Sequence, residues 1–241
     1  PTAADGASIF DHDIWVLCSD GDLQEGVSAE ASSLAGTQAL GNLNMIYDDN
    51  RISIEGDTHL SFTEDVAARY RAYGWQTLEV DWRKGGYKED VHALYEAISQ
   101  AQLETDKPTL ITLRTIIGWP SPEKQNTGKI HGSKLGAEEL AGLKLALGFD
   151  PQKSFEVSEA VINHTRTLVT KGEGLKQDWN QKFDQWKAAN PEAAKLFARL
   201  ESGDLPADMR IAAQSGCDLI ALASHGHKLL GDIVYGSTID K

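Results

Sequence analysis

The stretch "IWVLCSDGDLQEG", residues 14–26, places a short apolar run directly before three acidic residues and two glycines. The run at 14–18 is rich in β-branched and aromatic residues, which predicts a buried strand. The residues after it predict a turn and then a helix over about 24–40. Strand, turn and helix in this order form the first part of a βαβ unit, and the carboxyl end of such a strand is where open α/β sheets bind ligands.

Three further apolar runs predict strands at residues 43–48, 77–82 and 109–115. Between the last two, Val91, Leu94 and Ile98 recur at near-helical spacing, which predicts a helix within 88–105. Strands that alternate with helices of this length favour an α/β fold, a parallel sheet with flanking helices.

Composition excludes several classes of function. The net charge of -13 argues against non-specific nucleic-acid binding, which needs a basic surface. No apolar stretch approaches the roughly 18 residues of a membrane span, and the first residues lack the basic and apolar parts of a signal peptide. Cys18 and Cys217 each border an apolar run, as buried free thiols do, which favours a reducing, cytoplasmic setting.

The pattern changes after Trp119. Residues 120–136, "PSPEKQNTGKIHGSKLG", form a polar segment of a length that is usually either functional or disordered. Residues 137–201 are helical in pattern, with Trp179, Phe183 and Trp186 on one face, as expected for core packing. The motif "SGDLP" at 202–206 predicts a helix end and a turn.

Asp20 invites two interpretations from the residues alone. A calcium-binding EF-hand loop that began at Asp20 would need Gly at its sixth position and Glu at its twelfth, where Glu25 and Ala31 stand. In a parallel sheet, however, Asp20 and Asn50 would lie at one edge. Together with a backbone carbonyl and phosphate oxygens they could bind Mg²⁺ or Ca²⁺, and Gly21 would let a phosphate approach. A plain acidic turn remains the alternative.

Several longer motifs surround these residues. Asp20, Gly21 and Asn50 resemble the thiamine diphosphate motif G-D-G…N, with Ser19 in place of its first glycine. The stretches "DGDLQEGVSAEASSLAGTQALGNL", "YDDNRISIEGDT", "EDVAARYRAYGW", "KPTLITLRTIIGWPSP", "GKIHGSKLG" and "LGFDPQKSFEV" follow in order. From about 13 to 206 the sequence resembles transketolase, namely the later half of its N-terminal thiamine diphosphate domain.

The resemblance implies a cofactor site. Asp20 and Asn50 would bind the divalent metal through their side chains, and Ile52 through its carbonyl. Gly21 would donate its backbone N–H to the diphosphate. His131 would contact the phosphates or the substrate side.

The same resemblance implies further contacts and an activity. Ile54 and Ile117 would pack against the thiamine rings, and Glu25 and Glu30 correspond to glutamates buried near a subunit interface. The implied reaction is the transfer of a two-carbon ketol unit between sugar phosphates by a homodimer. Because other parts of the family's site are not found here, the chain is expected to supply a half-site and not to be active alone.

Residues 207–241 depart from this family. "GCDLIALASHGHKLLGDIVYGSTIDK" resembles the C-terminal part of universal stress protein domains, but Gly226, Gly231 and Gly236 do not keep the ATP-binding spacing of that family. We therefore expect a partial thiamine diphosphate domain at 1–206 and a stress-protein-like fragment at 207–241. The alternatives are a nucleotide-binding or interaction module, and a catalytically silent dimerising fragment.

Overall fold

The computed structural model describes residues 9–203, 221–223 and 234–236. The chain divides into two compact units, Pro1–Leu168 and Val169–Lys241. This division falls inside one long helix, since that helix continues from the first unit into the second. The division at 206 rests on resemblance and stays a prediction.

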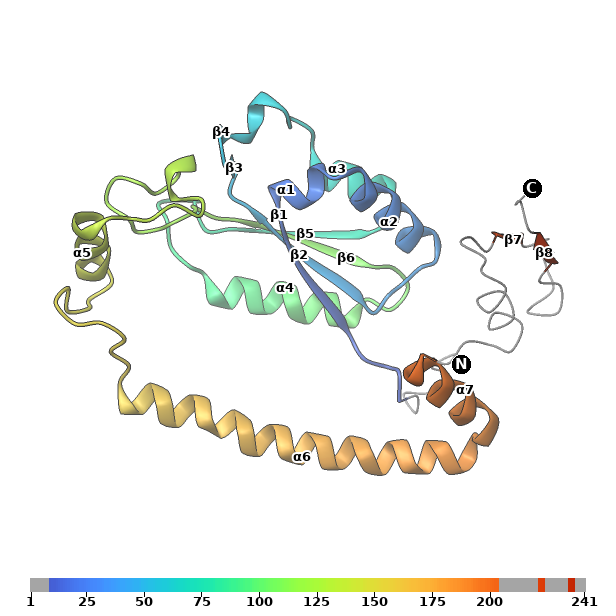
Figure 1. Ribbon diagram of the computed structural model, residues 1–241. Helices are drawn as coiled ribbons and strands as arrows, with labels where there is room; N and C mark the ends of the chain where they lie inside the picture. Colours follow the sequence, from blue (N-terminus) through green and yellow to red (C-terminus); the bar gives the residue numbers. More distant parts are fainter. Residues whose placement is uncertain (1–8, 204–220, 224–233, 237–241) are drawn as a thin grey trace, which may run out of the picture. The chain divides into compact units, whose positions relative to one another are not determined.

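A four-stranded parallel sheet forms the centre of the first unit (Figure 1). Its strands lie in the order β1 (Ile14–Ser19), β2 (Leu43–Asp49), β6 (Thr109–Arg114), β5 (Gln76–Asp81). The register aligns Ser19 with Asp48, and Asp48 with Leu113, so the carboxyl ends of these strands share one edge. The predicted α/β fold with a parallel sheet and flanking helices is confirmed.

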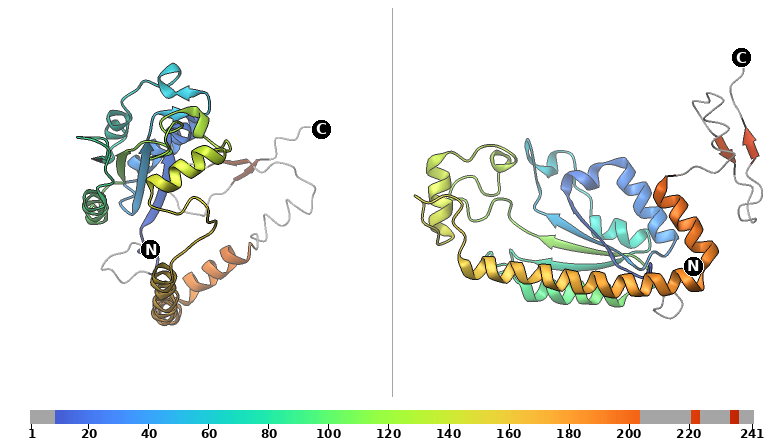
Figure 2. Two further views of the ribbon diagram at one scale, coloured as in Figure 1. Left: turned by 90° about the vertical axis from the view of Figure 1, so that its left-hand side faces the viewer. Right: turned by 60° about the horizontal axis from the view of Figure 1, so that its bottom comes forward.

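Helices cover both faces of the sheet (Figures 1 and 2). One face carries α2 (Gly26–Thr37) and α3 (Val66–Ala72), and the other carries α4 (Val91–Leu103). Side chains alternate along a strand, so Leu110 packs in the first core and Ile111 in the second.

The helix predicted at 24–40 spans only residues 26–37 as α2, and the turn predicted before it is a short helix. Residues 20–37 form α1 (Asp20–Gln24) and α2, and Glu25 lies between them in an extended conformation. The Ser28 hydroxyl donates a hydrogen bond of 2.7 Å to the Glu25 carbonyl, which gives α2 its own start. α1 therefore begins at Asp20, directly after the strand.

Short elements escaped prediction because they span too few residues to show a period. They are β3 (Ile52–Ser53), β4 (Gly56–Asp57), the 3₁₀ turn η1 (Thr58–Leu60) and α3. Asp65 caps α3, since its carboxylate accepts a 2.8 Å hydrogen bond from the Ala68 N–H.

The polar segment at 120–136 is held in place by its neighbours. It contains η2 (Gly128–Ile130) and leads into α5 (Ala137–Ala146). Glu139 on α5 accepts hydrogen bonds from the Glu123 and Lys124 N–H groups, both at 2.9 Å, and from the Ser121 hydroxyl. These bonds close the segment into a defined loop.

The second unit is helical where the structure describes it, apart from two short strands. It contains the later part of α6 (Glu159–Ala189) and α7 (Pro191–Ser202). Phe183 stacks between Trp179 and Trp186, with ring centroids 4.9 and 5.9 Å away, and meets Phe197 of α7 edge-on. The predicted aromatic face thus packs against itself and α7, but it is not part of a buried core, since α6 has no buried residue and Trp179 is 39% exposed.

Most of the predicted stress-protein-like tail lies outside the described residues, as does Cys217. The described part consists of β7 (Ala221–Ala223) and β8 (Val234–Gly236), which pair antiparallel.

Asn44 offers a direct test of packing in the central sheet. It is 0% exposed in β2, and neither its side-chain nitrogen nor its oxygen has a hydrogen-bond partner. An unpaired buried polar group costs about 1–3 kcal/mol. Asn44→Ile is therefore expected to raise the melting temperature by several degrees in a thermal unfolding experiment.

The exposed neighbour Asn42 provides the control, because its amide donates a 3.1 Å bond to the His12 carbonyl. Asn42→Ala should leave the melting temperature unchanged or slightly lower. A fall on Asn44→Ile would mean either that the Asn44 amide is satisfied in the folded chain or that the larger side chain overpacks the site.

Candidate functional site

Asp20 is a buried carboxylate at the carboxyl edge of the sheet. It is 2% exposed, and its two oxygens each accept one hydrogen bond, from the Tyr47 hydroxyl at 2.7 Å and the Arg51 N–H at 3.0 Å. Burial raises the pKa of Asp20 above its ordinary value, although both hydrogen bonds act to lower it. A carboxylate stripped of water in this way gains strongly from a nearby cation.

Asn50 is held in a defined orientation beside it. Its amide nitrogen donates a 3.1 Å bond to the Asp48 carboxylate, and its amide oxygen accepts a 2.9 Å bond from the Ile52 N–H. Asp20 binds the same loop through Arg51, which has a positive φ of 61°. The structure thus brings Asp20, Asn50 and Ile52, the three predicted metal ligands, to one loop.

A second buried carboxylate, that of Asp49, lies alongside and forms ion pairs. Asp49 accepts bonds of 3.0 Å from the Arg114 guanidinium and 3.4 Å from that of Arg51. Burial lowers the pKa of Arg114, while the neighbouring Asp49 acts to raise it. Asp49 is therefore compensated by cations.

Tyr47 links these two carboxylates. Its hydroxyl lies 2.7 Å from Asp20 and 3.4 Å from Asp49, inside the core on the α2/α3 face. Burial, followed by the Asp20 hydrogen bond, raises the pKa of Tyr47, so the hydroxyl keeps its proton. Sequence reasoning missed Tyr47, Asp49 and Arg114; the run "YDD" at the end of a strand was the available signal.

Gly21 borders open space. A Cβ built on Gly21 would meet no heavy atom within 4 Å. Gly21 is also exposed, so there is room for a ligand beside it.

The loop that carries His131 packs against the loop that carries Ile54. A Cβ on Gly128 would lie 2.7 Å from the Ile54 carbonyl oxygen, and one on Gly118 would lie 2.0 Å from the Ile130 side chain. These close approaches bring η2 against the β3–β4 hairpin and against Gly118, in the segment that follows β6. His131, which follows η2, has an exposed side chain.

The remaining predicted residues lie at the surface of this single chain. Ile54 is 68% exposed, so core packing does not account for it, and Ile117 is half-buried. Glu25 and Glu30 are both exposed. Their predicted burial at a subunit interface stays a prediction, because burial there would need a second polypeptide.

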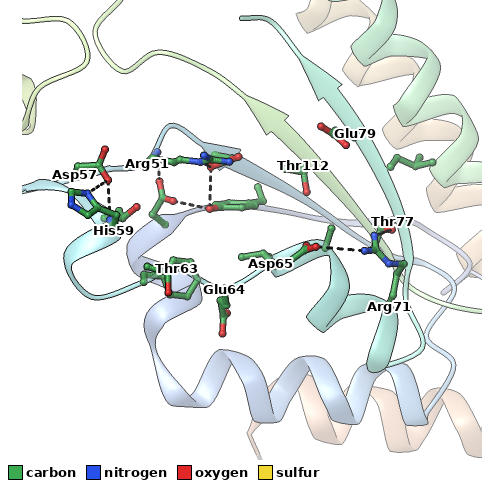
Figure 3. A pocket seen from close by; sticks show the side chains of 18 residues that line it. Arg51, Asp57, His59, Thr63, Glu64, Asp65, Arg71, Thr77, Glu79 and Thr112 are labelled. Atoms are coloured by element: carbon green, nitrogen blue, oxygen red, sulfur yellow. Dashed lines mark hydrogen bonds and ion pairs between the residues drawn. The ribbon is translucent and has the colours of Figure 1, made fainter. Parts of the chain in front are cut away.

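A cavity of about 670 Å³ opens beside Asp20 on the α3 side of the sheet (Figure 3). Arg51, Asp57 and His59 lie toward one end of it, and Arg71 and Thr77 toward the other. Its lining includes Asp20, Tyr47 and Asp49, but not Asn50, Ile52 or His131.

The described residues limit the kind of site that this edge can form. Within them, no group of three or more His, Cys, Asp or Glu side chains is arranged to hold a metal. A metal at Asp20 would thus depend on amide, carbonyl and ligand oxygens, the donor set that suits Mg²⁺ or Ca²⁺. None of the helices in this part of the chain is long and apolar enough to cross a membrane.

Comparison with known proteins identifies close relatives. The family described as "Transketolase, thiamine diphosphate binding domain" matches residues 1–206. Transketolase of Mycobacterium leprae is 52% identical over 206 residues, and transketolase 2 of Saccharomyces cerevisiae is 45% identical over 203. These alignments cover 86% and 84% of this chain, and 29% of each relative.

Solved transketolase structures are also similar to this chain. A transketolase mutant of Pichia stipitis, in a complex with xylulose 5-phosphate, matches with a TM-score of 0.73 and 42% identity. The match covers 83% of this chain and 29% of that one. Transketolase from Leishmania mexicana matches with a TM-score of 0.74 and 39% identity, over 84% of this chain and 29% of its own. The chain therefore spans less than a third of the relatives that it matches.

Proposed function

The chain belongs to the family of the transketolase thiamine diphosphate binding domain, and from this premise we propose that it supplies the metal and diphosphate half of a transketolase site. The proposed reaction transfers a two-carbon ketol unit between sugar phosphates. The observation that carries the proposal is the arrangement around the loop at 50–52. A buried carboxylate and an oriented amide are both hydrogen-bonded to it.

In this proposal a divalent cation, Mg²⁺ or Ca²⁺, would be bound by Asp20, Asn50 and the Ile52 carbonyl. All three are hard oxygen donors, which such cations prefer. Support comes from Asp20, which is buried yet makes no ion pair with any residue in the described ranges. A cation would balance its charge.

The cofactor would occupy the edge of the sheet next to this metal. Gly21 would donate its N–H to the diphosphate, His131 would bind phosphate or substrate oxygens, and Ile54 and Ile117 would cover the thiamine rings. Support comes from the open space beside Gly21 and from the exposed apolar side chain of Ile54. When bound, thiamine diphosphate supplies the electron sink for the two-carbon transfer.

We further propose that the site is completed by other polypeptide segments, including a second copy in a homodimer. Apolar side chains of β1 and α2 support this, because Leu17 is 78% exposed and Val27 and Leu34 are also exposed. Glu25 and Glu30 would become buried at that interface. Full activity is then expected only from the completed site.

Calorimetric titration of the 241-residue chain with thiamine diphosphate in the presence of MgCl₂ or CaCl₂ tests the proposal. Metal-dependent binding, and a melting temperature that rises with cofactor concentration, are the expected results. A folded chain that shows neither heat nor a thermal shift at millimolar cofactor would contradict the half-site.

The thiol of Cys18 supports the proposed cytoplasmic location. It is buried and unpaired. Burial, with Asp22 and Asp20 nearby, raises the pKa of Cys18 to about 12. Such a thiol is a packed core group and resists modification at neutral pH.

Residues 207–241 lie beyond the family match. Deleting them is therefore expected to leave the affinity for thiamine diphosphate unchanged, as measured by the same titration. The alternative, a nucleotide-binding tail, predicts ATP binding that is lost in the deletion and kept in Asp20→Asn. Loss of thiamine diphosphate binding on deletion would show that the tail contributes to the folded cofactor domain.

A further inference from the structure

The Tyr47 hydroxyl has one proton and two carboxylates within reach. It lies 2.7 Å from Asp20 Oδ1 and 3.4 Å from Asp49 Oδ1. The shorter distance is that of a strong O–H···O bond, and the longer one is at the limit. The Tyr47 hydroxyl therefore donates its hydrogen bond to Asp20.

The two carboxylates differ in how their charge is compensated. Asp49 pairs with the Arg114 and Arg51 guanidinium groups. Asp20, among the described residues, is bound only by the Tyr47 hydroxyl and the Arg51 backbone N–H, which are both neutral. A neutral donor orients a carboxylate without cancelling its charge, whereas an arginine would compete with a metal ion.

The donor is also rigidly placed. Tyr47 is 3% exposed on the central strand β2 and packs in a core cluster with Leu23, Val66 and Leu110. Its ring cannot follow a rotating carboxylate. With one donor on each oxygen, the plane of the Asp20 carboxylate is set, and each oxygen keeps a second lone pair.

We propose that Tyr47 is a positioning residue for metal binding, which holds Asp20 in the orientation that a divalent cation requires. This inference rests on the proposed function of the site. Tyr47 acts through Asp20 and needs no contact with the metal or the cofactor. Partners that orient metal ligands in this way typically change metal affinity by roughly 10- to 100-fold when they are removed.

Tyr47→Phe in the full chain tests this role, because it keeps the ring and removes only the donor. The measurement is the Mg²⁺ dependence of thiamine diphosphate binding by calorimetry. We expect the Mg²⁺ concentration for half-maximal binding to rise by about 10-fold or more. Affinity for the cofactor should recover at saturating Mg²⁺, which a general loss of structure would not allow.

Tyr70→Phe is the matched control. Tyr70 lies in the same core cluster, and its hydroxyl accepts a buried 3.0 Å bond from Ser32. Its removal should leave the Mg²⁺ dependence unchanged. Tyr47→Met, which also lacks the donor, is used if Tyr47→Phe does not fold.

The outcomes separate this inference from the proposed function. If the unmodified chain binds thiamine diphosphate and Tyr47→Phe shows the same Mg²⁺ dependence, only the positioning role is overturned. An equal shift in Tyr47→Phe and Tyr70→Phe also overturns it, because the effect would then be structural. No binding by the unmodified chain overturns the site, and the inference with it.

Discussion

Asp20→Asn is expected to abolish metal-dependent binding of thiamine diphosphate, with a loss of affinity above about 100-fold. Removing a residue that only orients a metal ligand already costs roughly 10- to 100-fold in metal affinity, and loss of the ligand itself should cost more. Asp20 is the one charged side chain among the three proposed ligands. Asparagine keeps the shape of the residue. Its amide can still donate to the Tyr47 oxygen and accept from the Arg51 N–H, so the local bonds seen at Asp20 have replacements. Calorimetry with MgCl₂ measures the effect.

The same substitution is expected to stabilise the cofactor-free chain. Burial raises the folded-state pKa of Asp20 above its value in the unfolded chain. A carboxyl with a raised pKa contributes stability at a pH below its unfolded pKa, and that contribution is lost as the pH rises through the folded pKa. The melting temperature of Asp20→Asn relative to the unmodified chain should therefore increase as the pH is raised from the acid range to neutrality.

Asp57→Asn is the matched control for charge. Asp57 lines the same cavity and accepts bonds from the His59 N–H at 2.9 Å and from Nδ1 at 2.8 Å, but its side chain is half-exposed. The substitution removes the same charge as Asp20→Asn without changing a proposed ligand, so the affinity for the cofactor should change little. An equal loss in both variants would point to the overall negative field of the site and away from a ligand role for Asp20.

Gly36→Ala is expected to destabilise the fold by about 3 kcal/mol or more, a large effect for one added methyl group. A Cβ on Gly36 would lie 1.8 Å from the Tyr73 carbonyl oxygen and 2.9 Å from its carbon. Both are backbone atoms at the end of α3, so no side-chain movement relieves the clash. Chemical denaturation with urea measures the loss in free energy of unfolding.

Gly26→Ala, at the start of the same helix, is the control. A Cβ there meets no heavy atom within 4 Å, and alanine favours the helix over glycine by roughly 0.5–1 kcal/mol. It should be neutral or stabilising. An unchanged stability of Gly36→Ala would mean that α2 and α3 are not in close contact at this point.

The parallel sheet and the placement of Asp20 and Asn50 at one edge of it could be predicted from the sequence. Both depend on local patterns, since apolar runs of strand length alternate with helical periods. Parallel strands also bring their carboxyl ends to one edge whatever the details of packing. The motifs around these residues extended the prediction to the cofactor.

The partners of these residues were decided by the tertiary structure. The alternation of side chains puts Tyr47 on a face of β2, but it does not reveal that its hydroxyl reaches Asp20, 27 positions away, or that Arg114 compensates Asp49. The break at Glu25 and the closure of the loop at 120–136 likewise depend on particular hydrogen bonds, one from Ser28 to Glu25 and three to Glu139. Such bonds have no sequence period. They form only when packing brings together residues that are distant along the chain, or when a local turn competes successfully with the helix.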